Sequence, residues 1–108
     1  MRANVYFTRE ITPEKVVELY RALGVELPGK VAVKVHSGEK GNQNFLRPEF
    51  WCPMVEEVHG TIVECNTAYG DAAGGVRDHT ESHRKLLQEH GWTKYFDVDL
   101  IDAEGPDV

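Results

Sequence analysis

VAVKVHSGEKGN, residues 31–42, indicates the fold class of this chain more clearly than any other segment. Its valines alternate with Ala32, Lys34 and His36, which is the pattern of a strand with β-branched residues on its buried side. The strand passes abruptly into a polar loop, in which Gly38 and Gly41 let the backbone approach a ligand closely. The segment therefore predicts a buried strand that ends at a candidate binding site.

Upstream of this segment the sequence predicts a short strand and a helix. Residues 4–8 (NVYFT) have the composition of a strand. Thr12 and Pro13 then make a helix start, with a hydroxyl N-cap and a proline at the first helical position. Apolar residues follow at helical spacing, and Gly24 lies where a left-handed residue ends a helix. We expect the apolar stripe of this helix to cover one face of a sheet.

Downstream, the sequence predicts a second helix and a third strand. The helix is expected over residues 47–59, and Pro53 predicts a kink or an irregular first turn because it has no N–H and its ring displaces a carbonyl. Gly60 should end this helix. Residues 61–65 (TIVEC) read as a strand that leads into a second polar loop, residues 66–75.

A third helix and a fourth strand complete the pattern. Asp78 and Glu81 have the spacing of a capping box, and the helix should run to His90. Residues 98–101 form the last expected strand, and an acidic, solvated tail follows. Strands that alternate with helices imply right-handed crossovers and a mainly parallel sheet. We predict one α/β domain over residues 1–108, a Rossmann-like three-layer α/β/α sandwich with about four mainly parallel strands and three helices.

Composition excludes several classes of function. The chain has 18 acidic against 12 basic residues and a net charge of -6, with no Lys/Arg cluster, so nucleic acid and acidic membrane surfaces are not expected partners. No apolar run approaches the roughly 20 residues that span a bilayer, and we expect a soluble, cytoplasmic protein. Cys52 and Cys65 are too few for a four-cysteine metal or iron–sulfur site and read as buried thiols.

Polar residues gather where the predicted strands end, which is where open parallel sheets bind ligands. Backbone N–H groups near the loop glycines could surround an anion, with charge supplied by Lys40, Arg47 or Arg77. Ordinary loop glycines remain the alternative, since the chain has neither a P-loop nor a G-x-G-x-x-G motif. The candidate ligand-binding residues are Lys34, Gly38, Glu39, Lys40, Gly41, Asn42, Arg47, Asn66, Thr67, Tyr69 and Arg77.

The histidines allow two further interpretations. His79 and His83 lie four residues apart on a predicted helix and could bind a metal ion with His36 and Glu39. Alternatively His36 or His83 could act as a general base beside an arginine that holds a substrate carboxylate or phosphate. A hydrogen-bonded structural histidine needs neither role. Both chemical interpretations stay open.

Lys34 is the one charged residue in an otherwise apolar strand. Its ammonium must reach a carboxylate or the sheet edge, because an unpaired buried charge is costly. Glu64 can be that partner if the two strands are adjacent.

An ordered series of motifs runs through the chain, namely VAVKVHSGEKGN, then LRPEF at residues 46–50, then ECNTAYGDAAGGVRDHTESH and QEHGW. This series resembles domain-of-unknown-function family 362. It covers nearly the whole chain, and Glu64-Cys65 departs from the Asp-Thr that is common in the family. The positions that the resemblance selects are Lys34, His36, Gly38, Glu39, Gly41, Asn42, Arg47, Pro48, Asn66, Thr67, Tyr69, Arg77, Thr80 and His83.

The resemblance implies more than the residues alone. Members of family 362 are usually longer and often carry a ferredoxin-like, cluster-binding segment, so this chain resembles the N-terminal part of such a protein, a partial domain. It also implies a distant similarity to the nickel-pincer lactate racemases. We expect no iron–sulfur cluster from Cys52 and Cys65 alone, and the cofactor is unknown.

The expected function is binding of a small anionic ligand or cofactor in a redox or ferredoxin-linked protein. Lys40 and Arg77 would clamp the anion, and His36 and His83 are the candidate catalytic groups for proton transfer. One alternative is a non-catalytic interaction domain that self-associates through an open sheet edge, as a homo-oligomer or with the rest of a longer protein. The other is a metal-dependent enzyme domain.

Overall fold

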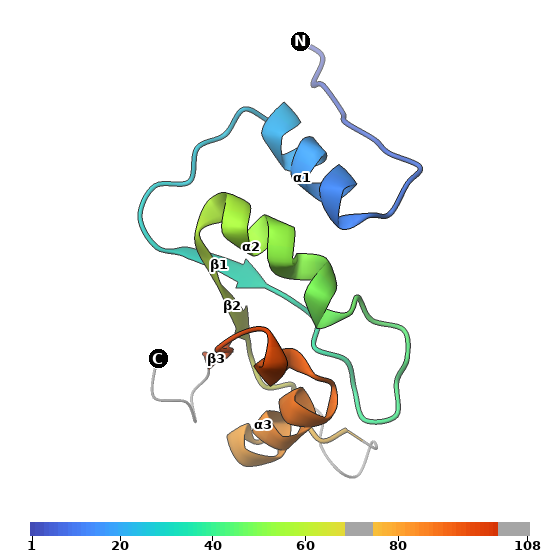
Figure 1. The fold of residues 1–108 in the computed structure, drawn as a ribbon, viewed down its shortest axis with the longest axis vertical. Helices are drawn as coiled ribbons and strands as arrows, with labels where there is room; N and C mark the ends of the chain where they lie inside the picture. The colour runs from blue at the N-terminus through green and yellow to red at the C-terminus, as the bar shows by residue number, and fades with distance from the viewer. Residues whose placement is uncertain (69–74, 102–108) are drawn as a thin grey trace.

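The computed structural model describes residues 1–68 and 75–101 of the chain (Figure 1). In this part of the chain it contains three α-helices, three strands and two 3₁₀ turns. The elements in order are α1 (Pro13–Ala22), β1 (Val31–Lys34), the turn η1 (Pro48–Trp51), α2 (Cys52–Val58), β2 (Gly60–Glu64), α3 (Thr80–Glu89), the turn η3 (Trp92–Lys94) and β3 (Asp99–Leu100).

The three strands form one parallel sheet in the order β1-β2-β3. Val31 lies opposite Gly60 in the first pair, and Glu64 lies opposite Leu100 in the second. The chain therefore has a mixed α/β fold with a parallel sheet, and β1 and β2 are adjacent. Since the strands run in the same direction, their carboxyl ends open onto one edge.

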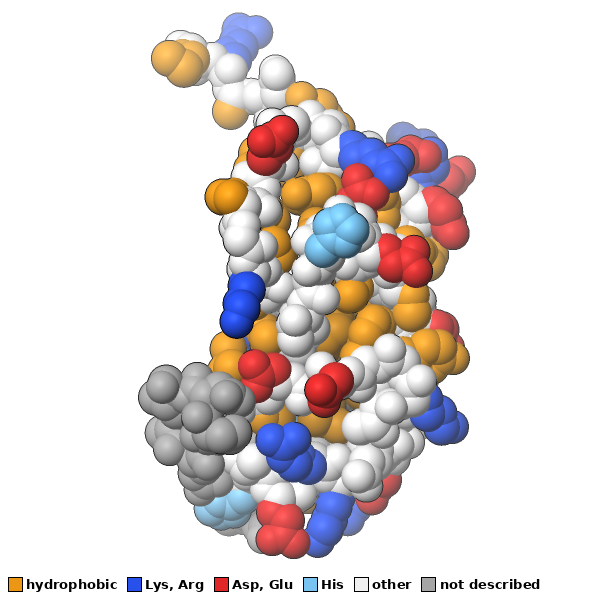
Figure 2. Space-filling view, turned by 60° about the vertical axis from the view of Figure 1, so that its left-hand side comes forward, with side chains coloured by type: hydrophobic (Ala, Val, Ile, Leu, Met, Phe, Trp, Pro, Cys, Tyr) orange, Lys and Arg blue, Asp and Glu red, His pale blue; other side chains and the backbone are white. Residues whose placement is uncertain are grey.

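The prediction of an amino-terminal strand is wrong for the described residues. Residues 4–8 form no strand, and the side chains of Val5 and Phe7 are 88% and 79% exposed. In Figure 2 this end of the chain projects from the top of the molecule with apolar side chains on it. Strand propensity alone is weak, because a strand is stable only when it pairs with a sheet and buries one face.

The helices are not arranged as the sequence predicted. Helix α1 packs on α2, and α2 packs on β2, so α1 does not cover a face of the sheet. On one sheet face, Ala32 lies opposite Thr61 and both are exposed. The apolar core forms on the other side, between the sheet, α2 and the α3–η3 region, and comprises Val35, Ile62, Leu87, Trp92, Val98 and Leu100.

Several helix ends follow the sequence signals. Thr12 caps α1, where its hydroxyl accepts a hydrogen bond from the Lys15 N–H at 3.2 Å. Gly24 follows the helix with φ of +62°, a left-handed conformation that glycine adopts without steric cost. The turn η1 precedes α2, as the prediction of an irregular start near Pro53 required.

Two helix ends differ from expectation. His59, with φ of +49°, is the left-handed residue that ends α2, and Gly60 instead begins β2. A Cβ on Gly60 would lie 2.8 Å from a Val33 methyl, so this glycine permits close packing. The capping box of Asp78 and Glu81 does not form, because His79 occupies the N-cap and contributes no side-chain cap.

Two further features bear on earlier expectations. No helix in the described ranges is long and apolar enough to cross a membrane. Cys52 and Cys65 are free, partly buried thiols. The predicted acidic tail and the middle of the second polar loop lie outside the described residues.

Candidate functional site

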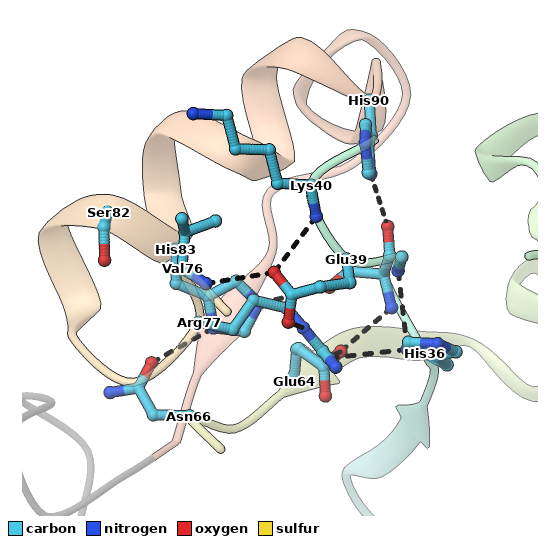
Figure 3. A network of polar contacts seen from close by, with 12 residues as sticks. His36, Glu39, Lys40, Glu64, Asn66, Val76, Arg77, Ser82, His83 and His90 are labelled. Carbon is cyan, nitrogen blue, oxygen red and sulfur yellow. Dashed lines mark hydrogen bonds and ion pairs between the residues drawn. The ribbon is translucent and has the colours of Figure 1, made fainter. Parts of the chain in front are cut away.

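Glu64, the last residue of β2, lies at the centre of the polar residues at the carboxyl edge (Figure 3). Its side chain forms an ion pair with Lys34 at the end of β1, as predicted from the strand pattern. It also accepts hydrogen bonds from the backbone N–H groups of Ser37 at 2.9 Å and Cys65 at 3.1 Å. The residue is 1% exposed, so these contacts replace water around a buried charge.

The Glu64 carboxylate is ionised at neutral pH. Burial raises the pKa of Glu64, but the hydrogen bonds from Lys34, Ser37 and Cys65 outweigh burial and hold the pKa below its usual value. Arg77 contributes a further contact, with its Nη1 3.4 Å from the second Glu64 oxygen.

A second ion pair continues the network toward the loop that follows β1. Arg77 donates from Nε to Glu39 at 3.0 Å, and the other Glu39 oxygen accepts from the backbone N–H groups of Lys40 and Val76. Burial raises the pKa of Glu39, whereas these hydrogen bonds and Arg77 lower it below its usual value. Two carboxylates therefore hold the buried Arg77 guanidinium.

His83 is fully buried and bridges two polar side chains. Its Nδ1 lies 3.0 Å from Asn66 Oδ1, and its Nε2 lies 3.1 Å from Ser37 Oγ. Because the Asn66 amide nitrogen donates to Thr80, its oxygen is the acceptor that faces Nδ1. The network therefore assigns the proton to Nδ1, and Nε2 accepts from the Ser37 hydroxyl.

His83 is neutral in this environment. Burial is the main cause that lowers its pKa, to about 4, and Arg77 lowers it further while Glu64 raises it. The order hydroxyl, imidazole, amide is one that can activate a serine nucleophile. Ser37 is fully buried, however, so a substrate has no access to its hydroxyl in this structure. We assign these contacts a structural role, which joins the end of β1 to α3.

Ser37 belongs to this network, although the sequence did not select it as a candidate site residue. Its carbonyl accepts from Trp92 Nε1 at 3.0 Å and lies 2.9 Å from His90 Nδ1, so one residue ties the end of β1 to the segment after α3. Its position directly after a buried strand and before a glycine was the available signal. His90, which the sequence placed at the end of the third helix, also belongs to the network.

Gly38 has a packing role. Its φ is +88°, and a Cβ there would lie 2.5 Å from the Phe45 ring and 2.9 Å from His90. Phe45 stacks on the His90 ring with centroids 4.7 Å apart. Gly41 also has positive φ, but nothing lies within 4 Å of its Cβ position.

Other predicted ligand residues lie outside this cluster or have different roles. Arg47 lies over the Phe45 ring at 4.2 Å and hydrogen-bonds to Gln43. The Lys40 side chain extends away from Glu39 in Figure 3. The Asn42 side-chain oxygen accepts a hydrogen bond from the Asn44 backbone N–H within the same loop.

Two members of the second polar loop remain. Thr67 donates its backbone N–H to the Arg77 carbonyl at 2.7 Å, which ties this loop to the segment before α3. Tyr69 lies outside the described residues.

The four predicted metal ligands do not come together. His79 is exposed and lies 3.5 Å from Asp78, whereas His83 is buried against Ser37 and Asn66. Within residues 1–68 and 75–101, no three His, Cys, Asp or Glu side chains are grouped so that they could share a metal ion.

His36 and Lys34 are the exposed side chains that contact the buried ion pairs, whereas the Glu39 side chain is only 16% exposed. His36 is exposed, and its Nδ1 lies 3.4 Å from both the Gly38 N–H and Arg77 Nη1, so the network assigns its proton to Nε2. The Lys34 side chain is 52% exposed. Its ammonium donates to Glu64 and to the Val35 carbonyl, which leaves one of its three N–H groups for a ligand.

The comparisons with known proteins find no matching family model, no matching curated protein and no matching solved structure.

Proposed function

We propose that the carboxyl edge of the sheet binds a small anion, such as a carboxylate or a phosphate. The observation that carries this proposal is the convergence of His36, Glu39, Glu64 and Arg77 at one edge, from three separate segments: the loop after β1, the end of β2 and the residues before α3. Open parallel sheets bind ligands at this edge. Two exposed side chains there carry hydrogen-bond donors, His36 and Lys34.

The buried residues of the site act on the ligand through the exposed residues His36 and Lys34. Arg77 was expected to clamp the anion, but its guanidinium is already held by Glu39 and Glu64. A ligand would have to displace a carboxylate to reach it. We therefore assign Arg77 a positioning role, in which it orients the His36 ring through Nδ1.

The resemblance to family 362 supports the same edge, because it selects Lys34, His36, Glu39 and Arg77. Under this resemblance the ligand site serves a redox or ferredoxin-linked protein, and His36 is its exposed candidate for proton transfer. His83, which is buried and neutral, keeps the structural role described above.

Isothermal titration calorimetry with inorganic phosphate tests the proposal. We expect millimolar binding at pH 7 and a loss of about tenfold or more in His36→Ala, since a hydrogen bond to a charged group contributes on the order of 1.5–3 kcal/mol. The matched control is His59→Asn, because asparagine tolerates the left-handed conformation and His59 lies at the opposite end of β2 from Glu64.

Lys40→Met tests whether Lys40 contacts the anion, as the sequence predicted, or whether the site depends on His36 and Lys34. Because the Lys40 side chain extends away from the cluster, this variant should bind phosphate as the parent chain does. Equal affinity in the parent chain and His36→Ala would contradict the proposed site.

A further inference from the structure

The amino-terminal segment exposes apolar side chains that a folded protein normally covers. Val5, Phe7 and Ile11 are largely exposed, and residues 1–11 belong to no helix or strand. The sequence of residues 4–8 is nevertheless that of a strand. The segment therefore has strand-forming residues without a strand partner among the described residues.

The outer edge of β1 offers the complementary backbone groups. In the described part of the chain β1 pairs only with β2. Val35 donates its N–H to Val63 in β2, and N–H groups alternate in direction along a strand. The N–H groups of Ala32 and Lys34 therefore point away from β2, at an edge that can accept another strand.

We propose that residues 4–8 of one copy add as a strand to the free edge of β1 in a second copy, and that the exchange is reciprocal. In Figure 1, α1 lies between the amino-terminal segment and the chain that leads to β1, so the segment does not reach its own β1 in this arrangement. Reciprocal pairing gives a closed, twofold-symmetric dimer. This inference does not depend on the proposed anion site.

The chain is more extended than a compact domain of the same length. Its Cα radius of gyration is 15.6 Å. A compact domain of this length has a radius of roughly 13 Å. The second copy supplies what the exposed segment lacks, namely the backbone N–H groups of Ala32 and Lys34 that point away from β2.

Sedimentation equilibrium of the 108-residue chain, with the variants Val5→Pro and Tyr6→Pro, tests this inference. Adjacent N–H groups point to opposite sides of a strand, so one of the two prolines must remove an interchain hydrogen bond. We expect a monomer–dimer equilibrium in which at least one variant dimerises about tenfold more weakly. The matched control, Arg2→Pro, lies outside the exchanged strand and should dimerise as the parent chain does.

Amide hydrogen exchange identifies the edge that is used. The Ala32 and Lys34 amides should become protected as the concentration rises, whereas Val33, which faces β2, should be protected throughout. A chain that stays monomeric, or a dimer in which both proline variants associate normally, would overturn the inference. Protection of Ala32 and Lys34 in a monomer would show pairing within one chain and would overturn it equally.

Discussion

Glu64 holds together the ends of β1 and β2 and the segment before α3. It is a buried carboxylate that contacts Lys34, Arg77 and the Ser37 backbone. A buried ion network contributes little stability compared with an apolar core of the same size. Removal of one member is nevertheless strongly destabilising, because a buried charge is left without its partner. Glu64 is therefore the residue whose replacement should affect the fold most strongly at this edge.

The first prediction concerns the charge on Glu64. Glu64→Gln keeps the shape but leaves Lys34 and Arg77 with less negative charge beside them, and we expect a loss of about 3 kcal/mol in the free energy of unfolding. Urea denaturation measures it. The control is Glu81→Gln, which removes an exposed pair with Lys85 and should leave the urea midpoint nearly unchanged. Similar midpoints for the two variants would contradict the central place of Glu64.

The second prediction concerns the pH dependence of stability. The pKa of His83 falls from 6.5 to about 4 in the folded chain. The unfolded chain therefore takes up the proton first, and stability should fall as pH drops from about 6.5 to about 4, by up to about 3 kcal/mol. The lowered pKa values of Glu39 and Glu64 add a separate loss below their ordinary value of 4.5.

His83→Gln isolates the histidine contribution. In this variant the slope of stability against pH between about 6.5 and about 4.5 should flatten, while the loss at lower pH remains. Denaturation at a series of pH values checks both ranges. An unchanged slope in the upper range would show that His83 is not the group that titrates.

Individual residues of the network were partly predictable from the sequence. The Lys34–Glu64 pair followed from one charge in an apolar strand and from strand adjacency. The partners of Arg77 did not, because spacing along the chain does not show whether a guanidinium faces a ligand or a carboxylate 38 residues away. The contacts of Ser37 could not be predicted for the same reason, because its partners His83, His90 and Trp92 are all distant from it in the sequence.

The loop after β1 keeps its shape through packing as well as through glycine conformation. Gly38 and Gly29 both have positive φ, but only Gly38 has the Phe45 and His90 rings against its Cβ position. Backbone strain should affect an alanine at either position, whereas the steric clash is specific to Gly38. The two glycines therefore separate these causes.

The third prediction follows from this comparison. Gly29→Ala should cost about 1 kcal/mol in unfolding free energy, from left-handed strain alone. Gly38→Ala should cost about 3 kcal/mol, because the Phe45 and His90 rings must also move. Thermal or urea denaturation of both variants gives the difference. Equal losses would show that the loop adapts freely around Gly38.

Elements whose signals are local were predicted well. Thr12-Pro13, Gly24 and the irregular turn before Pro53 depend on neighbouring residues, and each lies where the sequence placed it. Residues 4–8 show the opposite case, because a strand needs a partner that local sequence cannot supply. The capping box failed for a related reason, since His79 rather than Asp78 became the N-cap.

For the whole molecule, the sequence predicted the mixed α/β class and the parallel sheet but not the layering. Helices that alternate with strands predict a parallel sheet, because a helix that crosses over between two strands lets the second strand run in the same direction as the first. Which face a helix covers depends on tertiary packing, and α1 packs on α2 instead of on the sheet. The molecule therefore presents its polar cluster at the carboxyl edge of β1 and β2 and an uncovered apolar segment at its amino-terminal end.

The measurement that tests the anion site most directly is a ¹⁵N-resolved NMR titration of the chain with inorganic phosphate. We expect saturable shift changes at the amides of His36, Gly38, Val76 and Arg77, lost in His36→Ala and retained in His59→Asn. Saturable changes elsewhere on the surface, or none at these amides up to millimolar phosphate, would contradict an anion site at the carboxyl edge of the sheet.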